Sequence, residues 1–208
     1  MPDKKQKKKQ SPLSSRGVMK RKIRFDSFEA QRVVERCYDR VKYAMFSASV
    51  ILHVISDNNE ADELNSIIND TINTALKDME KAKIQFQTVL DDAGIEEMLD
   101  YTEAKSYTFE IDSPKLSQYI KAINTLDDLV KMIDTAWMNG EIDDEVKKDA
   151  CRSWQKRLIN MSVKIVKVER KVRNAIHESG KSTDEVETEL ESFEQEESKS
   201  EESTCVAA

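Results

Sequence analysis

Residues 18–32, VMKRKIRFDSFEAQR, contain a short alternating segment that runs into the start of a helix. Within it the apolar positions Met19, Ile23 and Phe25 have one parity, and the cationic positions Lys20, Lys22 and Arg24 have the other. Successive side chains of a strand point to opposite faces, so this pattern predicts a β-strand over about residues 18–25. The strand has one apolar face and one cationic face. The fold and function expected for the chain depend on which other strand pairs with it.

A long helix is expected directly after this strand. Asp26 and Glu29 have the spacing of a capping box, and residues 27–56 contain no Gly or Pro. Apolar seams predict two further helices, over about residues 60–93 and 143–177, and Ser113 followed by Pro114 predicts the start of another over about 114–138. The heptad-like spacing of the seam in 60–93 indicates that this helix packs lengthwise on another helix. Residues 106–112, SYTFEID, are a second strand candidate.

The composition also favours helices. Four Gly, three Pro and 6% aromatic residues in 208 are few for a sheet-rich fold, because turns require Gly and Pro and strands favour aromatic residues. We therefore expect a mainly α fold, in which a bundle of long helices carries a short N-terminal strand.

The two ends of the chain are strongly opposite in charge. Residues 1–24 contain ten Lys or Arg against one Asp, whereas residues 181–208 contain ten acids against two Lys. Both ends are poor in large apolar residues, so we expect a disordered basic arm over 1–17 and a disordered acidic tail over 178–208. The net charge of −7 therefore does not argue against binding to a polyanion, which responds to local potential.

Little in the sequence indicates catalysis. Cys37, Cys151 and Cys205 are far apart and have no metal-binding spacing, so neither a disulfide framework nor a zinc site is indicated. There is no Gly-rich phosphate loop, and no uncharged stretch is long enough to span a membrane. We expect a cytoplasmic protein that is not an enzyme, holds no cofactor or metal and does not bind membranes.

A lone strand in a helical protein needs a partner for its backbone donors and acceptors. Antiparallel pairing with the same strand of a second protomer meets this need and predicts a homodimer. A two-stranded ribbon of this kind fits the major groove of double-stranded DNA. With the basic arm adding phosphate contacts, the candidate DNA-binding residues are Lys20, Lys22, Arg24, Arg21, Arg16 and Arg32.

The last predicted helix contains a second basic surface. Residues 151–176 have eight Lys or Arg and a single acid, Glu169. The residues that represent this surface are Lys156, Arg157, Lys164 and Arg170. They form either a solvated face that pairs with acids elsewhere, or a surface for a phosphate backbone or an acidic partner.

Two segments resemble a known family. KIRFDSFEAQRVV (22–34) resembles the strand and helix that open the AcaB-like transcriptional regulators of conjugative plasmids and integrative conjugative elements, with the Ala-Gln-Arg mark at Ala30, Gln31 and Arg32. Residues 125–165 resemble the C-terminal helical hairpin of the same family. The marks of this second segment are Asp127, Asp128, Leu129 and Val130, the pair Thr135 and Ala136, and a turn over 140–143.

The resemblance implies a ribbon-helix-helix type DNA-binding dimer that regulates conjugative transfer genes. We expect an activator rather than a repressor, with the transcription machinery as a further partner. One feature departs from that motif, since residues 27–56 lack a turn between two short helices. Either a bend lies near residues 44–49, or the long helices replace the second helix of the motif. Two other functions stay open, a relaxosome or partition accessory DNA-binding protein and a helical scaffold that binds no DNA.

Overall fold

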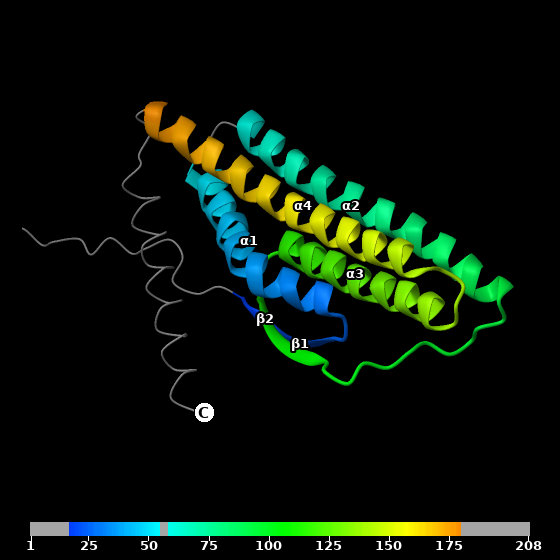
Figure 1. The fold of residues 1–208 in the computed structure, drawn as a ribbon. Helices are drawn as coiled ribbons and strands as arrows, with labels where there is room; N and C mark the ends of the chain where they lie inside the picture. Colours follow the sequence, from blue (N-terminus) through cyan, green and yellow to red (C-terminus); the bar gives the residue numbers. More distant parts are fainter. Residues whose placement is uncertain (1–16, 55–57, 180–208) are drawn as a thin grey trace, which may run out of the picture.

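The computed structural model describes residues 17–54 and 58–179 and shows a bundle of long helices with a small antiparallel sheet (Figure 1). The predicted mainly α fold is confirmed. The predicted basic arm up to residue 16, which includes Arg16, and the predicted acidic tail from residue 180 lie outside the described residues.

Six elements follow one another along the chain, and both predicted strands are present. In chain order they are β1 (Met19–Phe25), α1 (Phe28–Val54), α2 (Asn58–Asp92), β2 (Lys105–Ile111), α3 (Pro114–Met138) and α4 (Asp144–Ser179). Local sequence explains several of the ends. At the start of α3 the Ser113 hydroxyl accepts a hydrogen bond from the Leu116 N–H. Pro114 follows as the first helical residue, and because proline has no backbone N–H it leaves no donor unsatisfied there. Gly94 and Gly140 have φ values of 68° and 80° just after α2 and α3, a conformation that glycine adopts without strain.

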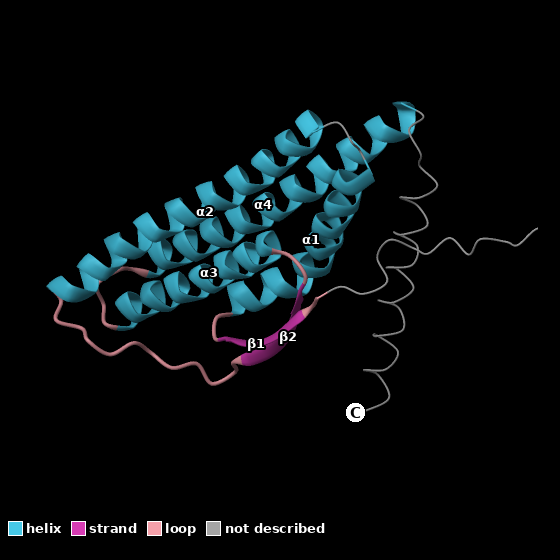
Figure 2. Cartoon of the chain, turned by 180° about the vertical axis from the view of Figure 1, so that it is seen from behind, coloured by secondary structure: helices cyan, strands magenta, loops and turns pink. Residues whose placement is uncertain are grey.

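The core lies within one chain, and α3 contributes most to it. α1 runs beside α4, and α2 packs on α3 and α4, as Figures 1 and 2 show from opposite sides. Fully buried apolar side chains of α3 include Leu116, Ile123, Leu126, Leu129 and Ile133. Within the described ranges, no helix is both long enough and apolar enough to cross a membrane.

The sheet is a two-stranded ribbon at the side of the bundle, close to the start of α1 (Figure 2). β1 pairs antiparallel with β2, with Met19 opposite Ile111 and Phe25 opposite Lys105. The predicted strand is therefore confirmed, but its partner comes from the same chain and not from a second protomer. The backbone groups that required a partner have one in cis, so strand pairing gives no reason to expect a dimer.

α1 is continuous and contains no turn of the kind that separates two helices in a ribbon-helix-helix motif. It runs from Phe28 to Val54 without interruption. Both ribbon views show that it changes direction part of the way along (Figures 1 and 2). Over the described part of this region, the chain therefore bends and does not break.

Candidate nucleic-acid interface

The outer face of the β1–β2 ribbon is the surface on which the predicted cations gather. Lys20, Lys22 and Arg24 lie opposite Glu110, Thr108 and Ser106, respectively, and directly opposed residues share a face. The side chains of Lys20 and Arg24 are 72% and 59% exposed, and Lys22 is exposed as well. The structure thus brings three of the six predicted DNA-binding residues together on one polar, solvent-facing surface.

The inner face of the ribbon is anchored by aromatic side chains. The Phe25 ring lies 6.0 Å from the rings of both Tyr107 and Phe109, and Tyr38 of α1 stacks edge to face on Phe109 at 4.8 Å. Aromatic pairs at these distances stabilise beyond the area they bury. Phe25 and Phe109 are fully buried, so the strand that presents the cations is fixed to the helical body.

Two of the three outward cations are held by carboxylates. Lys20 forms an ion pair with Glu110 at 3.1 Å, and Arg24 forms one with Asp26 at 2.8 Å. Lys22, opposite Thr108, makes no ion pair with any residue that the structure describes. Lys20 and Arg24 must each give up an ion pair to bind an anion, whereas Lys22 has none to break among the described residues.

The remaining predicted contacts lie elsewhere. Arg21 is exposed on β1 but has the parity of the inner face. Arg32 is on α1, where its guanidinium lies 5.7 Å from the centre of the exposed Phe28 ring. The structure does not place Arg21 and Arg32 on the ribbon face with Lys20, Lys22 and Arg24.

A buried carboxylate holds the junction between β1 and α1. Asp127 of α3 accepts hydrogen bonds from the N–H of Asp26 (3.0 Å), the N–H of Ser27 (2.7 Å) and the hydroxyl of Ser27 (2.6 Å). Asp26 and Ser27 directly precede α1, and a negative charge near the N-terminus of a helix is favourable. Burial nevertheless raises the pKa of Asp127 above its ordinary value, because its desolvation outweighs the hydrogen bonds.

Gln31 fastens the same junction from the other side. Its side-chain amide donates to the backbone carbonyls of Phe25 and Glu103, each at 3.1 Å. It therefore ties the end of β1 to the loop that leads into β2. The family resemblance includes Gln31 and Asp127 but assigns no role to either. The structure shows that both hold the ribbon in position.

Glu35 of α1 connects the ribbon to the helix at its outer edge. It accepts hydrogen bonds from Lys105 (3.0 Å) and from the Tyr107 hydroxyl (2.9 Å). Both bonds favour the charged form and lower the pKa of Glu35. Burial together with the neighbouring carboxylate raises the pKa of Tyr107 to about 12.

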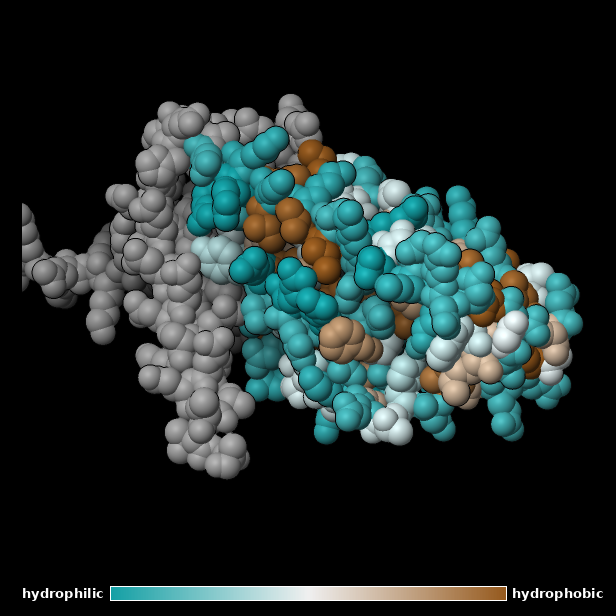
Figure 3. Space-filling view, in the orientation of Figure 1, coloured by the Kyte–Doolittle hydropathy of each residue, from teal (hydrophilic) through white to brown (hydrophobic). Residues whose placement is uncertain are grey.

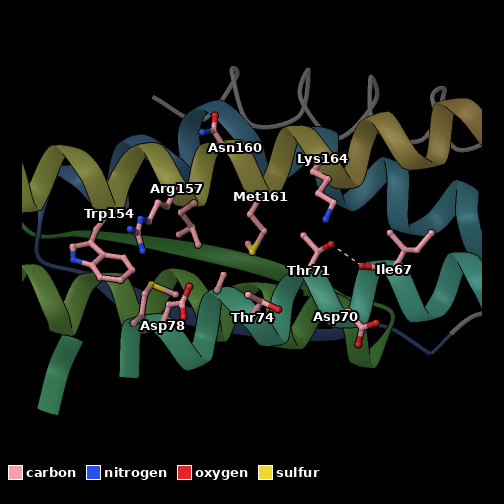
Figure 4. Close-up of a pocket in the computed structure, with 13 residues that line it drawn as sticks. Ile67, Asp70, Thr71, Thr74, Asp78, Trp154, Arg157, Asn160, Met161 and Lys164 are labelled. Atoms are coloured by element: carbon pink, nitrogen blue, oxygen red, sulfur yellow. Dashed lines mark hydrogen bonds between the residues drawn. The ribbon is translucent and has the colours of Figure 1, made fainter. Parts of the chain in front are cut away.

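The predicted second basic surface is divided between separate faces of α4. Arg157 and Lys164 point from α4 toward α2, where Asp70 and Asp78 line the facing side of a groove of about 700 Å³ (Figure 4). The Arg157 guanidinium also lies 4.6 Å from the centre of the Trp154 ring.

The other two members of the predicted set lie away from that groove. Arg170 lines a different groove, between α1 and α4, and Lys156 is exposed. The four predicted residues therefore do not form one continuous contact surface.

The described residues of the ribbon form neither a metal site nor a reactive thiol site. In the part of the chain that the structure describes, no group of three or more His, Cys, Asp or Glu side chains could hold a metal ion. Cys37 and Cys151 are buried, and burial raises the pKa of both thiols, to about 12 for Cys151. The expectation that the protein is not an enzyme stays a prediction.

Comparison with known proteins identifies a close structural relative. No family model and no curated protein matches the chain. The crystal structure of selenomethionine-containing AcaB from uropathogenic E. coli matches it with a TM-score of 0.81 and 36% sequence identity, over 83% of this chain and 90% of that chain. The match covers nearly the whole of the solved protein.

Proposed function

The chain belongs to the AcaB-like family, and from this premise we propose that it is a sequence-specific DNA-binding regulator of conjugative transfer genes. Family membership supports the coarser part of the proposal, a regulator related to conjugation. The finer part, DNA recognition through β1, is supported by a single observation: three cations lie on one face of a two-stranded ribbon fixed to a rigid body.

The ribbon has suitable dimensions and chemistry for the major groove. That groove admits a two-stranded β-ribbon, and Lys and Arg side chains bind guanine edges and phosphates there. On the proposed contact face, Ser106 and Thr108 of β2 add hydroxyl groups beside the cations of β1. Glu110 is the acid that β2 contributes to this face, where it pairs with Lys20 at 3.1 Å and with Lys42 of α1 at 3.8 Å. On binding, the Lys20 pair exchanges for contacts to DNA.

We propose further that the protein is a homodimer when bound to DNA. Two folded protomers on adjacent half-sites would double the contacts made by one short ribbon. Direct antiparallel pairing of two β1 strands with both outer faces on the same side would bring cation opposite cation, which is destabilising. We therefore place the dimer contact outside β1.

The test compares single cation variants on specific and nonspecific duplexes. A Lys22→Ala variant should lose about 1–3 kcal/mol at its operator and accept altered base pairs there if Lys22 contacts a base. If Lys22 contacts a phosphate instead, the loss should be equal on all duplexes and the salt slope should fall by about one unit. Lys121→Ala, which removes an exposed cation from α3, is the matched control and should leave binding unchanged.

Genome-wide mapping of the DNA sites that the protein occupies distinguishes a promoter regulator from a relaxosome or partition protein. Wild type should occupy promoters of transfer genes, whereas a relaxosome or partition protein would occupy a transfer origin or a centromere-like site. A reporter fused to an occupied promoter gives the sign of regulation. If the Lys20, Lys22, Arg24 triple alanine variant kept full site-specific occupancy, the ribbon could not be the reading surface.

A further inference from the structure

A groove with an apolar floor and a cationic rim runs between α1 and α4. Its floor is made by Cys37, Val41, Val163 and Val166, and its volume is about 200 Å³. Figure 3 shows the corresponding apolar patch, framed by hydrophilic side chains, where Figure 1 places α1 beside α4. Val163 is 43% exposed, so part of this apolar floor is open to solvent.

Four cations surround this floor. They are Arg36 and Arg40 of α1 and Lys167 and Arg170 of α4. No carboxylate lines the groove, and none of the four makes an ion pair with another residue in the described ranges. Like charges gathered around a low-dielectric floor create a local positive potential that attracts an anionic ligand.

We propose that the groove binds the acidic C-terminal segment of the same chain, centred on residues 187–197, ETELESFEQEE. Six glutamates of this segment supply the charge that the cationic rim lacks. Leu190 and Phe193 are its two large apolar residues, and they supply groups for the apolar floor. The segment therefore matches both properties of the groove.

The chain is long enough to fold back on the groove. Ser179 is the last described residue of α4, and Arg170 lies about 14 Å before it along the helix axis at 1.5 Å per residue. The fourteen residues from 180 to 193 span up to about 46 Å when extended. A tethered segment of this length has an effective concentration on the order of millimolar, so weak contacts suffice for binding.

The apolar floor favours an amphipathic peptide over a nucleic acid as the occupant. A phosphate backbone would pair with the four cations but would leave Val163 and Val166 without apolar partners. A bound acidic segment neutralises the groove and keeps DNA from it, so that the ribbon alone decides which DNA is bound. This inference goes beyond the proposed function, and its main test, intramolecular crosslinking, needs no DNA.

The experiment uses the full chain with photoreactive p-benzoylphenylalanine in place of Phe193. Irradiation should give crosslinks within one chain, and mass spectrometry should map them to residues 36–41 and 163–170. A mixture of isotopically light and heavy chains shows whether the two linked peptides come from the same molecule. Crosslinks that map to other helices, or that join two different chains, would refute docking in this groove.

Charge-reversal variants separate docking from nonspecific attraction. The double variant Arg40→Glu with Lys167→Glu should lower the crosslink yield about tenfold, since two attractive contacts become repulsive. The matched control, Lys77→Glu with Lys81→Glu, makes the same charge change at exposed positions of α2 and should leave the yield unchanged. Circular dichroism verifies that both variants are folded.

Two further results would overturn the proposal. Equal losses in the groove variant and the α2 variant would mean that only net charge matters. Crosslinks absent from the groove, together with weaker duplex binding by the groove variant, would mean that the groove contacts phosphates. Neither result bears on the ribbon, because the Lys22 test reports on that surface independently.

Discussion

Asp127 has an unusual position, because a buried carboxylate of one helix caps the start of another. Only 8% of the residue is exposed, and its two oxygens accept three hydrogen bonds from Asp26 and Ser27. The free energy that its desolvation costs is offset by donors that would otherwise be unsatisfied. The carboxylate therefore fastens the junction between β1 and α1 to α3.

An Asp127→Ala variant should lose about 2–3 kcal/mol of unfolding free energy, because it leaves two buried donors of Ser27 and the partly buried N–H of Asp26 without an acceptor. The neighbouring Asp128 is the control, since its carboxylate is half exposed and pairs with Lys83 on the surface at 3.0 Å. Asp128→Ala should cost less than about 1 kcal/mol. Urea unfolding of the two variants measures the difference, and equal losses would contradict the capping role.

The sequence identifies Gln31 and Asp127 as residues of interest but does not predict their contacts. The resemblance marked Gln31 and Asp127, but each acts on backbone groups of another element. Asp127 lies 100 residues from Ser27 in the chain. No local pattern encodes a partner at that separation, so the role of each residue becomes clear only when the fold brings the two segments together.

At the scale of elements, the two strands could be predicted but their pairing was missed. Residues 106–112 alternate as residues 18–25 do, with Tyr107, Phe109 and Ile111 on the inner parity and Ser106, Thr108 and Glu110 on the outer one. Matching amphipathic strands in one chain were a signal for pairing in cis. Helix ends, by contrast, follow from local chemistry, as Ser113, Pro114 and Gly140 show.

The contact between the ribbon and α1 should depend on pH through Glu35. Its pKa is lowered in the folded state by Lys105 and Tyr107, so its stabilising contribution is complete above the ordinary value of 4.5. The contribution is lost as the pH falls through the folded-state pKa. Glu35→Gln should therefore lower the unfolding free energy by less than about 1 kcal/mol at pH 7 and by nothing at the acid end.

Chemical unfolding of wild type and the Glu35→Gln variant between pH 7 and pH 3 measures this difference. Glu97→Gln is the control, because Glu97 is an exposed carboxylate that makes no ion pair with the described residues. A difference for Glu35→Gln that stayed constant over the whole pH range would show that the lost contact is not ionic.

For the molecule as a whole, the charge distribution separates two cationic surfaces. The ribbon carries Lys20, Lys22 and Arg24 on a polar face, whereas the groove between α1 and α4 surrounds an apolar floor with cations. The sequence predicted a basic α4 but not this division. The neighbouring helix decides which cations of α4 share a surface. Arg170 lies in the groove beside α1, whereas Arg157 and Lys164 lie in the groove beside α2.

The protomer has a complete core, since β1 pairs with β2 of its own chain and α3 is buried among helices of that chain. A protein whose strand required a second copy would have a thermal midpoint that rises with concentration, because association stabilises only the folded state. We expect the midpoint of this protein, measured without DNA, to be constant over a hundredfold range of concentration. Operator DNA should raise it, because a ligand of the folded state adds stability. A midpoint that rose with protein concentration alone would show that a protein–protein contact stabilises the fold before DNA is bound.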